Sequence, residues 1–240
     1  MADTCAKVWS WPQSLDQLRS QFVSAHPYPH IVLDNVFPAP LVESLHSDIP
    51  SAEDPAWIHW GGGKAEECDQ ASIKRGISDV SLLPASIARM LELLVCDEFV
   101  ADLGKLTGTQ DLIVDPTFSG GGLHCSGRGA ALRLHADPIR HPSPDEFDQA
   151  INLIMYLNPR WQETYGGNLE LWSRDGKARE VSIPPLFNRI VIFKADRSTF
   201  HGHPEPNRCP SGEYRASLAL YYYVTREQRI SMESNRPIWR

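Results

Sequence analysis

Residues 131–138 of the chain read ALRLHADP, and the interpretation of the other segments depends on this stretch. If residues 132–137 form a strand, successive side chains alternate between its two faces, so His135 and Asp137 project from the same face. They then lie about 6.5–7 Å apart along the backbone, close enough for one metal ion to bind both. We therefore predict a metal site on this strand.

A second stretch, residues 196–217 (DRSTFHGHPEPNRCPSGEYRAS), supplies the other wall of the same site. His201 and His203 both follow an apolar run at 190–194, and only one of them is needed. We prefer His201 because it comes directly after Phe200, where a core strand would still be inside. His203 lies in a Gly-His-Pro context that favours a turn toward solvent, although both histidines could face the pocket if the segment stays extended. Two histidines and one carboxylate are the ligand set of mononuclear non-haem Fe(II) oxygenases.

The same His-x-Asp pattern occurs at His46 and Asp48, but in a different context. Apolar residues at helical spacing precede it, including Leu41, Val42 and Leu45. Residues two apart on a helix do not face each other. We therefore expect His46 and Asp48 to be an ordinary solvated helix end.

The length of 240 residues and the 42% hydrophobic content suit one large domain with a substantial core. We expect a single domain over residues 1–240, with a helical N-terminal part over about 1–110 and a β core over about 111–225. The formal net charge of −7 argues against nucleic-acid or anionic-membrane surfaces, because those gather lysine and arginine. The expected partner is a small-molecule or peptide substrate, and the oligomeric state is not predicted.

Cysteine usage and the N-terminal sequence bear on location. No run of roughly 18 or more apolar residues occurs, and the N-terminus lacks the layout of a signal peptide. The five cysteines are widely separated, with no Cys-x-x-Cys pair, and are Cys5, Cys68, Cys96, Cys125 and Cys209. These features favour reduced thiols and a cytoplasmic location, which would help keep bound iron ferrous. We interpret Cys125 and Cys209, which lie near the two halves of the site in sequence, as small buried hydrophobic residues.

The first half of the chain reads as mainly helical. Apolar spacing, with a capping box at Ser14 and Gln17, predicts helices at 15–25, at 39–48 and, as one bent helix or two, within 84–107. A short strand is expected at 30–34. Residues 57–79 have three consecutive glycines and no sustained period, so we expect a long surface excursion that is functional or mobile.

Beyond Gly108, short β-branched or aromatic runs separated by Gly, Pro and Asn predict strands. The runs lie at 111–114, 131–134, 151–157, 168–172, 180–183, 189–194 and 216–224. Such a series predicts a jelly roll with a ligand between two sheets. The predicted fold class is α+β and mainly β, with the N-terminal helical layer packed on one sheet. The glycines at 120–122 read equally well as a flexible turn or as backbone passing close to the pocket.

Arg215 places a cation at the mouth of an apolar strand. A buried guanidinium needs an anionic partner, and its planar fork can hold a carboxylate by two parallel hydrogen bonds. With Ser217 on the same strand face, Arg215 could anchor the far carboxylate of a dicarboxylic acid. A surface salt bridge at a strand start is the alternative.

Segments of the second half resemble, in the same order, the Fe(II)/2-oxoglutarate-dependent oxygenases of the prolyl 4-hydroxylase-like group. The segments are GGGLH (120–124), LHAD (134–137), NLIMYLNPRW (152–161), YGGNLELW (165–172), PLFNRIVIF (185–193), FHGHP (200–204) and YRASLALYYY (214–223). The resemblance covers roughly residues 111–224 and implies a double-stranded β-helix. In addition, YPHIVLD at 28–34 is similar to the family's first strand.

The resemblance implies roles for individual residues. The residues that match the iron ligands are His135, Asp137 and His201. Arg215 matches the residue that pairs with the C5 carboxylate of 2-oxoglutarate, and Tyr156 matches a tyrosine that often hydrogen-bonds the same co-substrate. His203 matches no ligand position. Because an aspartate stands where related halogenases carry a small residue, hydroxylation or another plain oxidation is expected.

The implied activity is that of a 2-oxoglutarate-dependent dioxygenase. It would use Fe(II), 2-oxoglutarate and O2, hydroxylate a small molecule or a peptide side chain such as proline, and release succinate and CO2. The competing interpretation is a cupin-like jelly-roll metal enzyme or binding module that does not use 2-oxoglutarate. That interpretation would leave Arg215 and Tyr156 without a role.

Substrate contacts are expected from the parts of the chain that match the family least. These are the stretches 57–79 and 140–150 (RHPSPDEFDQA), together with the cations Arg128 and Arg133 and the aromatic Trp172. Arg133 shares strand parity with the predicted ligands of the same strand, so it could line the same face.

Overall fold

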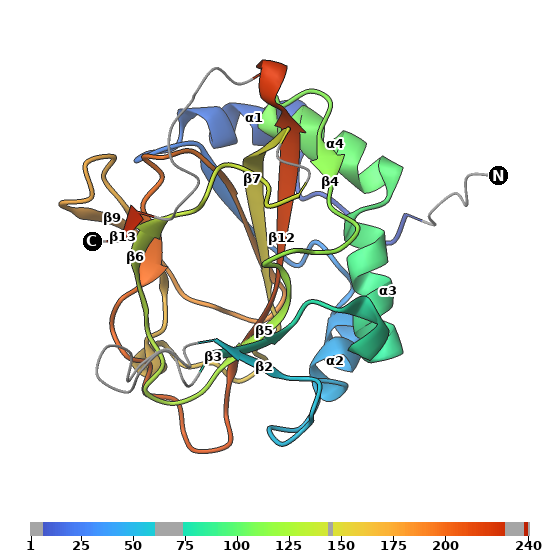
Figure 1. Ribbon diagram of the computed structural model, residues 1–240, viewed down its shortest axis with the longest axis vertical. Coiled ribbons are helices and arrows are strands. Elements are labelled where there is room, and N and C mark those ends of the chain that lie inside the picture. Colours follow the sequence, from blue (N-terminus) through green and yellow to red (C-terminus); the bar gives the residue numbers. More distant parts are fainter. Residues whose placement is uncertain (1–6, 61–73, 144–145, 229–237, 240) are drawn as a thin grey trace.

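Two antiparallel sheets lie face to face in the computed structural model, which describes residues 7–60, 74–143, 146–228 and 238–239 (Figure 1). The larger sheet has the strand order β1-β10-β7-β12-β5-β3-β2, with β4 also paired to β12. Its strands are β1 (His30–Asp34), β2 (Ile58–Trp60), β3 (Lys74–Ile77), β4 (Ile113–Val114), β5 (Gly122–Ser126), β7 (Phe147–Tyr156), β10 (Arg189–Lys194) and β12 (Arg215–Thr225).

The smaller sheet has the order β13-β6-β11-β8-β9. Its strands are β6 (Leu132–Ala136), β8 (Leu169–Trp172), β9 (Arg179–Ile183), β11 (His201–His203) and β13 (Ile238–Trp239). The mainly β fold agrees with the prediction, and residues from both sheets face a common interior.

The α-helices among the described residues are α1 (Leu15–Ser24), α2 (Ala39–Ser47), α3 (Ala85–Leu94) and α4 (Asp97–Thr107), and the 3-10 turns are η2 (Val80–Leu82), η3 (Glu163–Tyr165) and η4 (Arg226–Gln228). In Figure 1, α2, α3 and α4 lie beside the larger sheet, on the side away from the smaller one, and α1 lies at the top of the view, in contact with α4. The capping box of Ser14 and Gln17 begins α1, and Gly108, with a φ of 69°, ends α4. Residues 84–107 therefore form two helices rather than a single bent one. None of the described helices is long and apolar enough to cross a bilayer.

Alternation along β12 separates the helical side of the sheet from its interior. Leu218 and Leu220 belong to the large apolar cluster that also contains buried residues of all four helices, such as Phe22 and Phe99. Ser217, Ala219 and Tyr221, which alternate with these leucines, face the other way, into a cavity between the sheets. The helices thus support the sheet whose inner face carries Arg215.

Residues 57–79 contain more regular structure than predicted. β2 and β3 occupy the two ends of this stretch, and β3 pairs with β5 inside the larger sheet. The sequence of β3, KRGI, has no apolar alternation, so its position in the sheet comes from backbone pairing that a hydrophobic pattern does not reveal. Residues 61–73 lie outside the described part of the chain.

The glycines at 120–122 allow close approach between neighbouring strands. A Cβ atom on Gly121 would lie 2.6 Å from the carbonyl oxygen of Ala219, and one on Gly122 would collide with the carbonyl oxygen of Ile77. Gly122 also has a φ of 92°, a conformation that L side chains rarely adopt. The close backbone contact is therefore with β12 and with the end of β3. The sequence alone left two alternatives for these glycines, a flexible turn or backbone close to the pocket.

A bulge interrupts the alternation of β6. His201 of β11 pairs with His135, whereas His203 pairs with Leu132, so β6 has one residue more than β11 between these pairs. As a result Leu132 lines the cavity and Arg133 is exposed. The predicted sharing of a face by Arg133 and His135 is wrong for this reason.

Candidate metal centre

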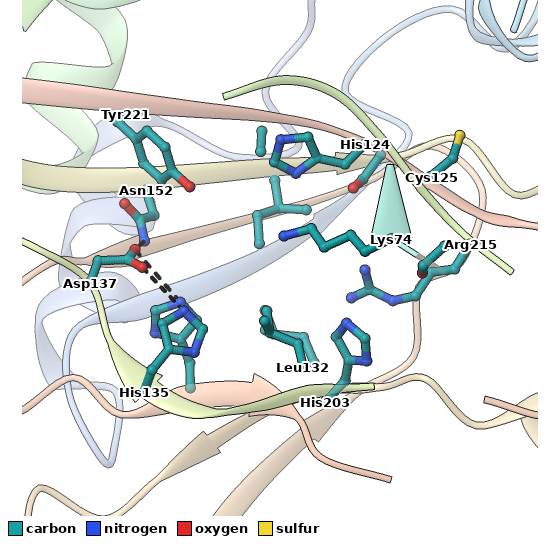
Figure 2. Close-up of a pocket in the computed structure, with 16 residues that line it drawn as sticks. Lys74, His124, Cys125, Leu132, His135, Asp137, Asn152, His203, Arg215 and Tyr221 are labelled. Carbon is teal, nitrogen blue, oxygen red and sulfur yellow. Dashed lines mark hydrogen bonds and ion pairs between the residues drawn. The ribbon is translucent and has the colours of Figure 1, made fainter. Parts of the chain in front are cut away.

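A cavity of about 240 Å³ lies between the two sheets (Figure 2). Its walls come from the inner faces of β3, β5, β7 and β12 on one sheet and from β6, β8 and β11 on the other. Asp137 and His135 lie toward one end of the cavity, and Arg215 lies toward the other (Figure 2). The segments predicted to form two walls of one site therefore meet.

His135, Asp137 and His201 bring their side chains to one point. Their potential ligand atoms all lie within 4.8 Å of one another. The Nε2 atom of His135 is 3.2 Å from Oδ1 of Asp137, and Nε2 of His201 is 3.7 Å from Oδ2. Cross-strand pairing of the two histidines brings their ring centroids to 4.5 Å, and Asp137 follows β6 by one residue.

The tautomer of both histidines is fixed by the backbone. Nδ1 of His135 lies 2.8 Å from the carbonyl oxygen of Arg133, and Nδ1 of His201 lies 3.0 Å from that of Thr199. A carbonyl oxygen can only accept, so each Nδ1 carries the proton and donates. In the neutral ring, Nε2 is then the atom with the available lone pair. Burial lowers the pKa of His201 to about 4, which favours that neutral ring.

Two amide side chains hold Asp137. Nδ2 of Asn152 donates to Oδ2 at 2.7 Å, Nε2 of Gln149 donates to the same oxygen at 3.3 Å, and Gln149 also donates to Asn152. Burial raises the pKa of Asp137, but His201, His135 and the Asn152 amide outweigh it and hold this pKa below its ordinary value. Neither amide was predicted from the sequence, although a polar residue within the buried run of β7 is a usable signal.

The donor set fits a ferrous ion. In their neutral forms, two imidazole nitrogens and a carboxylate would face one another at 3.2 and 3.7 Å without a proton between them. Lone pairs at that separation repel unless a cation joins them. Two histidines and one carboxylate form the ligand set that non-haem Fe(II) oxygenases use, and the Nδ1 bonds are the outer contacts that metal-binding histidines usually make.

Arg215 is buried and is held by neutral groups. Its Nε donates to the carbonyl oxygen of Gly167 at 2.7 Å, and its Nη2 donates to the hydroxyl of Tyr156 at 2.9 Å. Within the described parts of the chain, no carboxylate pairs with it. A buried guanidinium with only neutral acceptors favours an anionic ligand, and Arg215 lines the cavity. The surface salt bridge considered as an alternative is not what the structure shows.

Tyr156 and Ser217 lie beside Arg215 on neighbouring strands, and their backbones pair directly. Ser217 lines the cavity. Tyr156 is fully buried in the apolar cluster that contains Leu169 and Phe193, with its ring 5.0 Å from the guanidinium carbon. Burial raises the pKa of Tyr156, so its hydroxyl keeps a proton that it can donate. Both residues can therefore assist Arg215 in binding a carboxylate.

Three further basic residues line the cavity, namely Lys74, His124 and His203. The expectation that His203 turns toward solvent is wrong, because β11 stays extended through this residue and buries it. Burial lowers the pKa of His124 to about 3 and that of His203 well below its ordinary value, so both rings stay neutral. Lys74 was missed because it lies at the end of the stretch interpreted as a surface excursion.

The residues predicted as substrate contacts lie elsewhere. Arg133 is exposed, and Arg128 is exposed and donates to the carbonyl oxygens of Arg208 and Cys209. Trp172 packs on the small cluster that contains Phe200, and its Nε1 donates to Glu170. The lining of the cavity includes none of these three predicted contacts.

Cys125 and Cys209 are buried thiols and form no disulfide within the described residues. The side chain of Cys125 lies in the apolar cluster on the helical side of the larger sheet, and burial raises its pKa to about 12. The Sγ atom of Cys209 lies 3.2 Å from both Oδ1 of Asn207 and the carbonyl oxygen of Glu213. Cys209 therefore serves the loop before β12 rather than the metal centre.

Comparison with known proteins gives matches in sequence and in structure. The family model described as the 2OG-Fe(II) oxygenase superfamily matches residues 121–223. Human Egl nine homolog 1 is 25% identical over 123 residues, which are 46% of this chain and 26% of that protein. The match therefore spans about a quarter of the length of this relative.

Two solved structures show the same fold. A prolyl hydroxylase from Trichoplax adhaerens, in complex with a hypoxia inducible factor oxygen degradation domain peptide fragment, has a TM-score of 0.61 at 19% identity, covering 91% of this chain and 94% of that one. HygX from Streptomyces hygroscopicus, with nickel, 2-oxoglutarate and hygromycin B bound, has a TM-score of 0.50 at 14% identity, covering 80% and 82%. At these identities the likeness establishes the jelly-roll fold alone.

The family match covers the strands that carry the candidate ligands and all but a few residues of β12. The His135, Asp137 and His201 donor set lies where two strands of this fold meet. Iron and 2-oxoglutarate are the cofactors that such a site takes. Residues 121–223 of this chain therefore resemble the 2OG-Fe(II) oxygenase superfamily in sequence, and the chain shares its fold with a prolyl hydroxylase.

Proposed function

We propose that this protein is a Fe(II)- and 2-oxoglutarate-dependent dioxygenase that hydroxylates a peptide side chain such as proline, or a small molecule. One observation carries the proposal. A single buried cavity has a His-Asp-His donor set toward one end and the guanidinium of Arg215 toward the other. A dicarboxylic keto acid has a chelating end and a carboxylate end, so it matches both.

The side chains of the cavity have separate roles in binding the metal ion and the keto acid. The three proposed metal ligands are His135, Asp137 and His201. Arg215, supported by Tyr156 and Ser217, binds the far carboxylate and orients the keto acid. When bound, Fe(II) and 2-oxoglutarate supply the oxidising chemistry, in which O2 is consumed, succinate and CO2 are released, and a substrate C–H bond becomes C–OH. The two sheets exclude bulk water from that reaction.

A prolyl side chain in a peptide is the first substrate class to test. The prolyl 4-hydroxylase-like sequence pattern supports it, as does the peptide bound to the structurally similar Trichoplax enzyme. A small molecule is the second class, supported by the hygromycin B bound to HygX. Arg128 and Arg133 lie outside the cavity, so any contact they make is with a part of the substrate beyond it.

An anaerobic titration with Fe(II) and 2-oxoglutarate tests the proposed function. The wild-type protein should develop a weak visible charge-transfer band that needs both additions. Arg215→Ala should lose the band at the same concentration of 2-oxoglutarate, because the far carboxylate loses its partner. Arg160→Ala, which removes an exposed arginine paired with Glu213, should keep it.

The same titration distinguishes a 2-oxoglutarate-dependent dioxygenase from the competing class of protein. A cupin-like metal enzyme or binding module would bind iron and show no change on addition of 2-oxoglutarate. That outcome would reject the proposed function. A screen of peptides and small molecules, read as succinate formation above uncoupled turnover, then identifies the substrate.

A further inference from the structure

We propose that Lys74 is a second co-substrate residue, whose ammonium group holds the carboxylate of the keto acid at the metal end while Arg215 holds the far one. This inference rests on the proposed function, because it assigns a position within the same cavity. It concerns a residue from the N-terminal part of the chain, before the segment that the family model matches.

The strand register places the two cations in one row. Lys74 of β3 pairs with Ser126 of β5, and Ser126 pairs in turn with Arg215 of β12. Adjacent strands lie about 4.7–4.9 Å apart, so the Cα atoms of Lys74 and Arg215 are about 9–10 Å apart. Both side chains line the cavity, and therefore both leave the sheet on its inner face.

The side chain of Lys74 runs across the cavity toward the proposed metal ligands. Figure 2 shows it extending from the side of Arg215 toward that of Asp137, with its nitrogen between the two. The effects of nearby charges on the pKa of Lys74 support this position. Burial and the charge of Arg215 together lower the pKa of Lys74 to about 8, and Asp137 acts in the opposite direction. The ammonium group is thus within electrostatic reach of both ends of the cavity.

A keto acid that reaches from Arg215 to the proposed metal ligands must pass this ammonium group. Its far carboxylate is matched by the planar fork of Arg215, so the carboxylate left for Lys74 is the one at the metal end. An ammonium group is a compact charge on a flexible stem, without the directional demand of a guanidinium. It therefore suits a carboxylate whose orientation a metal already fixes.

A second observation indicates that this part of the cavity receives a polar ligand. His203 lies on the opposite sheet, is 4% exposed, and lines the same space. Its Nδ1 has no hydrogen-bond partner among the described residues. Buried polar atoms without a partner are uncommon, and a ligand is one way to satisfy them. Lys74 and His203 thus bring polar groups to the cavity from the two sheets.

Ligand pairs can separate the two carboxylate sites. Calorimetric titration of the Mn(II)-loaded protein should compare 2-oxoglutarate with 2-oxopentanoate, which keeps the keto acid end and lacks the far carboxylate. Lys74→Met should weaken both ligands by about tenfold, the loss expected for one charge-assisted hydrogen bond. Arg215→Met should weaken 2-oxoglutarate and leave 2-oxopentanoate nearly unchanged. Lys177→Met, which removes an exposed lysine, should bind both ligands as the wild type does.

Two results with Lys74→Met would overturn the inference. One is unchanged binding of both ligands. The other is weaker binding of 2-oxoglutarate alone, which would assign Lys74 to the far carboxylate. Lys74→Gln and thermal unfolding of each variant identify any effect of misfolding. If the Mn(II)-loaded wild type binds neither ligand, the proposed function fails and this inference fails with it.

Discussion

The carboxylate of Asp137 is where the metal centre and the sheet interior meet. Histidine nitrogens approach it from β6 and β11, and the amides of Asn152 and Gln149 approach it from β7. One side chain therefore links the smaller sheet to the larger one. Its removal should affect metal binding more than folding, since the two amides and the neutral ring of His201 can remain buried without it.

The variant Asp137→Ala tests this expectation. Affinity for Fe(II) or Co(II) should fall by at least about a hundredfold, and 2-oxoglutarate-dependent succinate formation should be lost. The circular dichroism spectrum should stay that of the wild type. Unchanged succinate formation would remove Asp137 from the proposed ligands.

Tyr156→Phe tests the support of Arg215. The variant removes the hydroxyl that accepts from Nη2 of Arg215 and leaves a buried N–H without its partner. We expect a loss of about 1–3 kcal/mol in the free energy of unfolding and several-fold weaker binding of 2-oxoglutarate. Tyr222→Phe is a matched control, because it removes a buried hydroxyl bonded to the carbonyl oxygen of Leu94 on the helical side of the sheet. It should lose stability and keep the affinity for 2-oxoglutarate.

Residues differ in how far sequence alone could assign them. His135 and Asp137 were recognisable because the strand period predicts a shared face. Arg215 was recognisable because a cation in an apolar strand requires an anionic partner. Lys74 and His203 were not, because their positions depend on pairing between β3 and β5 and on how long β11 stays extended. Those features arise from contacts between distant segments.

The sequence predicts strands that contain a clear apolar run. It does not predict strands that lack such a run and are recognised only by their backbone pairing. β10 was predicted at its observed bounds and β12 to within a residue at each end, whereas β2 and β3 were taken for an irregular excursion. The bulge in β6 is a similar case. It adds one residue to β6 and leaves no mark in the sequence pattern. It nevertheless exposes Arg133 and turns Leu132 inward.

Gly122, the first residue of β5, gives a prediction for strand packing. Gly122→Ala should destabilise the protein by about 2–4 kcal/mol, because it adds a collision with the carbonyl oxygen of Ile77 to an unfavourable φ of 92°. Gly212→Ala is the matched control, with a φ of 85° and open space around the added Cβ. It should cost about 1 kcal/mol. If urea denaturation gives the same loss in the free energy of unfolding for both variants, the collision is relieved at no cost.

Buried histidines should make the stability of the metal-free protein depend on pH. Burial lowers the pKa of His124 to about 3 and of His201 to about 4, and that of His203 lies well below the ordinary value of 6.5. Below pH 6.5 the unfolded chain binds protons that the folded protein does not. The free energy of unfolding should therefore fall as the pH falls from about 6.5 toward the lowered values, by up to about 1.4 kcal/mol per pH unit for each histidine.

Urea denaturation of the metal-free protein between pH 7.5 and 5.5 measures this effect. His203→Gln should reduce the slope below pH 6.5, because one of the histidines that stay neutral in the folded protein is gone. A slope of zero, or a protein that gains stability on acidification, would contradict the assignment of these rings as neutral.

At the scale of the whole molecule, the order of elements could be predicted but the way the N-terminal part joins the sheet could not. The helical and β halves of the sequence differ in period, which predicts a mainly β fold with helices, as found. The same periods do not say that β1, β2 and β3 from the first half complete the larger sheet at both of its edges. The cavity therefore draws on both halves of the chain, and Lys74 is the clearest example.

The thiol of Cys125 belongs to the large apolar cluster on the helical side of the larger sheet, and burial raises its pKa to about 12. At neutral pH almost none of it is thiolate, the form that reacts with maleimides and iodoacetamide. In a variant that keeps Cys125 and replaces the other four cysteines with serine, alkylation should be slow while the helices stay packed on the larger sheet. The labelling rate would then measure how often the helices separate from the larger sheet.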